Sequence, residues 1–246
     1  MKYRSGKHSE KAGLEPGTLL HVGEHDSEAV TVHAFSYDAS GWEETGITDF
    51  SQAEMLKGKR GVTWIEVNGI HDVGIIKALG REFDLHDLVL EDIMNTYQRS
   101  KVEDYGNYLF AVLKMVQPAK TDELFVSEQV SFVLGPNWVL SFQEHTEDVF
   151  DPVRERIRNA KGKLREHGAD FLFYALVDAI VDDYFLILEG LGECVDTLED
   201  EVVGDVSIET LRRIHTVRQS TITLRRFSWH LREMLGALQR GDSDLM

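Results

Sequence analysis

The sequence predicts a protein of the α/β (α+β) class, with helices on both faces of a sheet and a long antiparallel helical hairpin after it. Two observations support this. The first half of the chain alternates short β-branched and aromatic runs with amphipathic helical segments. After Pro152 the pattern changes to helix, with apolar residues at intervals of three and four. A sheet flanked by such helices must bury both of its faces.

The first half contains three short runs that are typical of strands, at 18–23, 30–37 and 62–68. Their β-branched and aromatic residues favour the extended conformation. A helix should follow, because Asp72 can accept the hydrogen bonds of an N-cap and apolar residues then recur at helical spacing through Phe83.

Two longer strand regions come next, at 108–116 and 125–142. The second is interrupted by Gly135-Pro136-Asn137, a sequence suited to a tight turn. We therefore expect a hairpin of two strands there.

The first long helix is predicted from an apolar seam that begins after Tyr174. The residues of this seam are Val177, Val181, Tyr184, Leu188, Leu191, Val195, Leu198 and Val202. A helix from about 170 to 203 would span on the order of 50 Å and should project beyond the sheet. Simple core packing is the more ordinary explanation of such a seam.

Gly204 and Asp205 interrupt this pattern, and Ser207 can cap a second long helix. The apolar residues of that helix are Ile214, Val217, Leu224, Leu231, Leu235 and Leu238. The chain is thus expected to divide into a tail at 1–15, an α/β/α domain at 16–165 and a helical hairpin at 166–246.

Composition excludes several classes of partner. The formal net charge of −17 repels nucleic acid and anionic lipid. One cysteine, Cys194, excludes an intrachain disulfide. The sequence contains no run of about 18 uncharged apolar residues, so no membrane span is predicted. The sequence has no GxSxG, P-loop or GxGxxG motif, so no enzyme activity is expected.

Several segments, in order along the chain, carry a family resemblance. Residues 86–116 combine Glu91 and Asp92 on a short helical segment with a turn and a strand that opens with Glu103 and Asp104. The further segments are SEQVSFVLGPNWVLSFQE (127–144), VFDPVRERIR (149–158) and LVDAIVDDYF (176–185). Together they resemble the cytoplasmic domain of the CorA family of magnesium channels, from about Pro16 to Leu238.

This resemblance implies a three-layer α/β/α sandwich with a mixed sheet, followed by the hairpin. It also implies a regulatory role at the cytoplasmic face of the membrane, within a homopentamer of the full-length protein. The two membrane helices of the family, with Gly-Met-Asn between them, are absent here, so we expect that the chain ends before them.

The resemblance also gives the candidate site residues. Neighbouring carboxylates such as Glu91 and Asp92 are usually only solvated surface. In the family, however, the matching pair and an Asp that corresponds to Asp178 contribute to regulatory divalent-cation sites between subunits. Asp182 lies one turn beyond Asp178 and could share the ion. From the residues alone, Asp178 could equally form an intrachain ion pair.

The expected ligand is Mg²⁺, because hard carboxylate oxygens suit it. The resemblance leaves Co²⁺, Ni²⁺ or Zn²⁺ open, and no organic cofactor is expected. Asp242 and Asp244 do not match the remaining ligand of the family.

Two other functions stay open at this stage. The chain could be a soluble, oligomerising interaction protein built from an α/β domain and a coiled-coil-like hairpin. More remotely, it could be an enzyme that acts on an anionic substrate with metal at the acidic cluster. Two apolar spans with Gly-Met-Asn downstream of residue 246 would favour the channel.

Overall fold

The computed structural model describes residues 13, 15, 17–23, 29–48, 61–120, 123–204, 207–241, 243 and 245–246. The strands are β1 (Thr31–Asp38), β2 (Gly41–Gly46), β3 (Val62–Asn68), β4 (Lys101–Asp104), β5 (Leu109–Pro118), β6 (Phe125–Leu134) and β7 (Trp138–Gln143). The helices are α3 (Val73–Glu82), α4 (Asp87–Ile93), α5 (Asp151–Asn159), the 3-10 turn η2 (Leu164–Glu166), α6 (Ala169–Val203) and α7 (Ile208–Arg240).

The described strands form one mixed sheet in the order β2-β1-β3-β7-β6-β5-β4. β3 and β7 pair in parallel, with Ile65 opposite Leu140. The other neighbours pair antiparallel. The turn at 135–137 joins β6 to β7, as the sequence predicted.

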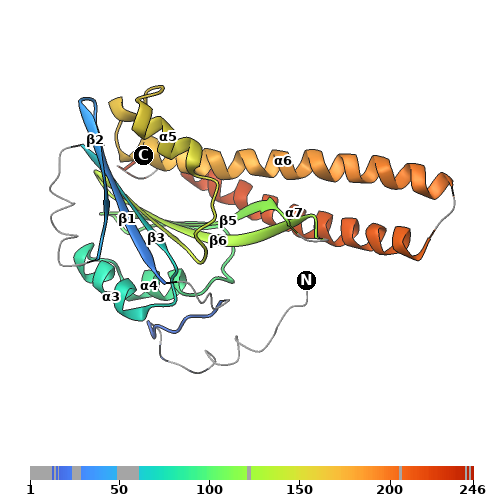
Figure 1. The fold of residues 1–246 in the computed structure, drawn as a ribbon. Helices are drawn as coiled ribbons and strands as arrows, with labels where there is room; N and C mark the ends of the chain where they lie inside the picture. Colours follow the sequence, from blue (N-terminus) through green and yellow to red (C-terminus); the bar gives the residue numbers. More distant parts are fainter. Residues whose placement is uncertain are drawn as a thin grey trace.

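Helices cover both faces of this sheet and make three layers (Figure 1). We call the side under α3 and α4 the α4 face, and the side under α5, α6 and α7 the α6 face. Alternate residues of each strand enter different cores, so Ile65 lies in the α4-face core and its neighbour Trp64 in the α6-face core. The predicted three-layer α/β/α fold is confirmed.

The long hairpin extends beyond the sheet (Figure 1). α6 contains 35 residues, which corresponds to about 50 Å of helix. Its first half packs on the sheet, where the Tyr184 hydroxyl donates to the carbonyl of Lys114 at 2.7 Å. Ser207 caps α7 in a reciprocal pair of hydrogen bonds with Thr210. The first half of α6 belongs to the core of the sandwich, and the second half projects from it. The helix thus belongs to both parts of the chain, and the domain boundary at 165 stays a prediction.

The apolar seam of α6 differs in detail from the prediction. Val177 and Tyr184 are buried as expected, but Ile187 is 5% exposed whereas the predicted Leu188 is 46% exposed. Val202, near the tip, is 47% exposed. Among described elements, α7 is the main neighbour of α6 beyond the sheet, so a narrower stripe of the helix is covered. In the described ranges, no helix has the length and apolar character that a membrane span requires.

One strand assignment was wrong, and one strand was missed. Residues 18–23 do not form a strand, because Val22 makes only an isolated bridge with Asn95 in the turn after α4. A turn offers no ladder along which the pairing could continue. The sequence analysis also missed β2, a polar edge strand. Its signal was the turn before it, where Asp38 Oδ1 accepts from the backbone N–H of Ser40 and Gly41 at 2.7 and 3.0 Å.

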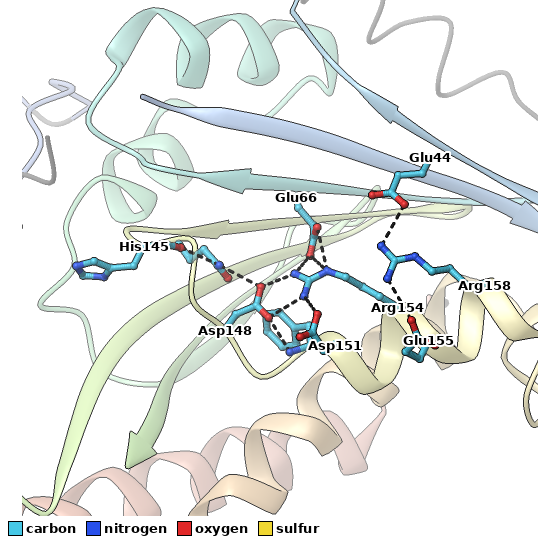
Figure 2. Close-up of polar contacts among 10 residues, drawn as sticks. Glu44, Glu66, His145, Asp148, Asp151, Arg154, Glu155 and Arg158 are labelled. Carbon is cyan, nitrogen blue, oxygen red and sulfur yellow. Dashed lines mark hydrogen bonds and ion pairs between the residues drawn. The ribbon is translucent and has the colours of Figure 1, made fainter. Parts of the chain in front are cut away.

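A buried ion-pair network fastens α5 to the sheet (Figure 2). Arg154 of α5 contacts Glu66 of β3 and Asp148 of the preceding loop, and the three side chains are 12%, 5% and 2% exposed. Burial alone would lower the pKa of Arg154, but its hydrogen bonds to Asp148 and Glu66 raise it overall. Burial raises the pKa of Glu66 to about 7, although Arg154 acts in the opposite direction.

We predict that Arg154→Met destabilises the chain by about 3–5 kcal/mol, because it leaves two buried carboxylates without their cation. Arg158→Met is the matched control on the same helix. Arg158 is 32% exposed and pairs with Glu44 and Glu155 at 3.1 and 3.3 Å, so its loss should cost about 0–1 kcal/mol. Urea denaturation measures both, and equal losses would contradict the prediction.

A second prediction concerns pH. Because the pKa of Glu66 rises from 4.5 to about 7 on folding, the folded state holds this proton more tightly. The resulting stabilisation is complete below pH 4.5 and is lost as the pH rises to about 7. Glu66→Gln has no titrating group at this position. As the pH rises between these values, the unfolding free energy of wild type should therefore fall by up to about 3 kcal/mol relative to that of the variant. Parallel curves of unfolding free energy against pH would show that Glu66 does not titrate in this range.

Candidate metal site

α4 presents the two neighbouring carboxylates in different directions. The residues that pack its other side into the α4-face core are Val89, Leu90 and Ile93. Consecutive residues on a helix diverge by about 100°. Accordingly, Glu91 Oε2 accepts from the backbone N–H of Gly17 at 2.7 Å, whereas Asp92 faces β4. Both carboxylates are half-buried.

Asp92 and Glu103 converge on one positive charge. Lys101 Nζ donates to Asp92 Oδ2 at 2.6 Å and to Glu103 Oε1 at 2.7 Å. Burial would lower the pKa of Lys101, but the hydrogen bonds to these two carboxylates raise it overall. The ammonium therefore acts as a stand-in cation. The oxygens that surround it are hard donors, the ligand type that Mg²⁺ prefers.

Gln129 of β6, which is 2% exposed, holds the turn after α4 through hydrogen bonds to its backbone. Its side-chain oxygen accepts from the backbone N–H of Gln98 at 3.0 Å, and its Nε2 donates to the carbonyls of Asn95 and Asp92 at 3.0 and 3.3 Å. Gln98 in turn donates to Asp92 Oδ1 at 2.5 Å. The orientation of Asp92 is therefore set by neighbouring side chains before any ion binds.

Sequence reasoning missed Lys101, Gln98 and Gln129. A signal existed for Lys101, because residues two apart on a strand share a face and Glu103 follows it at that spacing. No comparable signal existed for Gln129, whose contacts cross from β6 to the turn after α4.

Asp178 and Asp182 lie one turn apart on α6 and line the same cavity of about 90 Å³ between α5 and α6. Asp183 and Arg156 line it too. Among described residues, Asp178 and Asp182 have no hydrogen bond or ion pair, so the intrachain ion pair considered for Asp178 does not form there. Partial burial and the charge of Asp182 raise the pKa of Asp183. The sequence analysis had assigned no role to Asp183.

The two carboxylate pairs are not brought together within one chain. Glu91 and Asp92 belong to a helix on the α4 face, and Asp178 and Asp182 to a helix on the opposite face (Figure 1). No group of three or more His, Cys, Asp or Glu residues that could hold a metal occurs in the described part of the chain. Asp242 and Asp244 lie outside the described residues.

Comparison with known proteins relates this chain to cation transporters. Residues 59–246 match the family described as CorA-like Mg²⁺ transporter protein. The chain is 43% identical over 232 residues to the cobalt/magnesium transport protein CorA of Thermotoga maritima, covering 94% of this chain and 66% of that protein. It is 26% identical over 173 residues to the putative metal ion transporter YfjQ of Bacillus subtilis, covering 70% of this chain and 52% of that protein. It therefore spans less than two thirds of either relative.

Solved structures share the fold at low sequence identity. The full-length CmaX protein matches with a TM-score of 0.73 and 17% identity, over 90% of this chain and 67% of that one. The soluble domain of CorA from Methanocaldococcus jannaschii matches with a TM-score of 0.65 and 16% identity, over 89% of this chain and 82% of that one. These similarities establish the architecture alone.

Proposed function

The chain belongs to the family of CorA-like Mg²⁺ transporter proteins, and we propose that it is the cation-sensing, gating part of a divalent-cation channel or transporter. The family match over 59–246 and the 43% identity to the Thermotoga protein support this proposal. Because the chain spans 66% of that relative, the transport activity, the transported ion and the assembly are parts of the proposal.

In this proposal, Glu91 and Asp92 of one copy bind Mg²⁺ together with Asp178 and Asp182 of a neighbouring copy. The observation that carries it is the location of the two pairs on opposite faces of one sheet. One chain cannot direct both pairs at the same ion, whereas two copies packed side by side can. The two pairs differ in how far their side chains are held in place. Asp92 is already oriented by hydrogen bonds from Gln98 and Lys101.

Self-repulsion between these carboxylates couples binding to gating. When the two pairs approach across an interface, their negative charges oppose the contact, and a bound divalent cation supplies the charge that offsets this repulsion. The arrangement with the carboxylates together is thus favoured only when the ion is present. We assign that arrangement to the closed state, so a rise in cytoplasmic Mg²⁺ would reduce further entry.

The proposed assembly is a homopentamer at the cytoplasmic face of the cell membrane, with this chain as the part outside the bilayer. The Thermotoga relative is a cobalt/magnesium transport protein, so Mg²⁺ and Co²⁺ are the first ions to test. Ni²⁺ and Zn²⁺ are the next. The proposal includes no enzymatic reaction, no organic cofactor and no nucleic-acid partner.

A second candidate is a soluble interaction protein that oligomerises through its hairpin. One observation favours it: large apolar side chains are exposed along α6 and α7. They include Phe185 (60%), Leu186 (56%), Val203 (89%), Ile208 (72%) and Leu211 (58%). Such exposed apolar surface is typical of an interface between chains. In this alternative, assembly would not depend on the carboxylates.

We predict that Asp92→Asn in the full-length transporter weakens inhibition by Mg²⁺ without abolishing transport. The substitution removes one ligand and also relieves repulsion in the ion-free state, so the two states differ less in Mg²⁺ affinity. Coupling of this kind is typically about 1–3 kcal/mol, which corresponds to a shift of about 5- to 150-fold in the inhibitory concentration. Flux or current against cytoplasmic Mg²⁺ measures it.

Asp104→Asn is the matched control. Asp104 is an exposed acid of the edge strand β4. It accepts a hydrogen bond from the backbone N–H of Gly106 at 2.7 Å, a role that asparagine can fill. Its inhibition curve should coincide with that of wild type. An unchanged curve for Asp92→Asn would exclude this site, and loss of flux at every Mg²⁺ concentration with normal expression would exclude the sensing role.

A further inference from the structure

The Lys101 ammonium lies against one carboxylate of the proposed site, that of Asp92. The ammonium is 2.6 Å from Asp92 Oδ2 and 2.7 Å from Glu103 Oε1, and also 5.5 Å from the centre of the Phe110 ring. An ammonium has three N–H donors. Two of them are used here, and no other hydrogen-bond acceptor for Lys101 occurs in the described part of the chain.

The backbone fixes this placement. Lys101 and Glu103 are two residues apart on β4 and so project from the same face of the strand, in register with Val112 and Phe110 of β5. β4 is an edge strand. The side chains of Lys101, Asp92 and Glu103 are 21%, 20% and 40% exposed, so an ion from solvent can reach the same oxygens.

We propose that Lys101 is a tethered cation that competes with Mg²⁺ for the carboxylates of Asp92 and Glu103, and that it thereby sets the concentration to which the sensor responds. This inference rests on the proposed function. One ammonium between two carboxylates leaves a net negative charge, so a divalent ion is still attracted. The ion must displace the ammonium before it can bind Asp92 Oδ2 directly, and the two charge-assisted hydrogen bonds oppose that step.

The length of the lysine stem makes the exchange possible. Four methylene groups allow the ammonium to leave the carboxylates and remain hydrated, while the stem stays on the apolar surface of the sheet. Lys101 would then hold Asp92 in place at low Mg²⁺ and give up the site at high Mg²⁺. A purely structural ion pair would instead fasten α4 to β4 and have no effect on ion affinity in this direction.

The test is isothermal titration calorimetry with MgCl₂ on the 246-residue chain, at fixed ionic strength. Lys101→Met should raise the affinity for Mg²⁺ about tenfold, since it removes two hydrogen bonds that involve charged groups. Arg99→Met is the matched control. Arg99 lies two residues before Lys101, is exposed, and makes no hydrogen bond or ion pair with described residues. The variant therefore deletes one positive charge without removing such a contact. Its affinity should stay close to that of wild type.

Amine labelling gives a second measurement on the unaltered protein. Acetic anhydride should modify Lys101 slowly without Mg²⁺ and faster at saturating Mg²⁺. Lys120 serves as the internal reference, because its side chain is 80% exposed and, among described residues, pairs with Glu147 alone. Labelling of Lys101 that does not change with Mg²⁺ would overturn the inference, even if Lys101→Met failed to fold.

Asp92→Asn separates this inference from the proposed function. If Asp92→Asn weakens Mg²⁺ binding but Lys101→Met leaves it unchanged, the site is correct and the competition is not. If Asp92→Asn binds Mg²⁺ as wild type does, the proposed site itself is wrong. An equal gain in Lys101→Met and Arg99→Met would assign the effect to the general electrostatic field and would also overturn the competition.

Discussion

Arg154 lies between Glu66 of the sheet and Asp148 of the loop that leads into α5, almost completely shielded from water. Each of these charges would be costly to bury alone. Together they hold α5 on β3, and α5 is one wall of the cavity that contains Asp178 and Asp182. One wall of that cavity is therefore held on the sheet by one arginine and its two carboxylates.

The same layered construction explains why the candidate ligands do not meet. A sheet with helices on both faces places α4 and α6 on opposite sides, so acids on these helices point into different regions of solvent. A site that needs both is incomplete in one chain. This incompleteness would be a defect in a storage protein, but it suits a sensor, because the ion then reports on the arrangement of neighbouring copies. In our proposal, Lys101 adds a second level of control inside one copy.

Much of the fold could be predicted because the signals were local. Asp72 accepts N-cap hydrogen bonds from Gly74 and Ile75, and the turn at 135–137 lies between two strands as expected. Residues 18–23 were misassigned because β-branched composition does not specify a pairing partner. The position of Asp92 beside Lys101, and the isolation of Asp178 from any partner among described residues, depend on contacts between distant elements, which no local pattern encodes.

Sedimentation velocity of the 246-residue chain, in MgCl₂ and in EDTA, tests most directly whether the carboxylates of opposite faces meet between copies. Wild type should be a monomer or weak oligomer in EDTA, because the acidic surfaces repel each other. Mg²⁺ should promote its association, and Asp92→Asn and Asp178→Asn should each weaken that effect, since each deletes one side of the same interface. A stable pentamer in EDTA, or association in Mg²⁺ that neither substitution changes, would contradict the account.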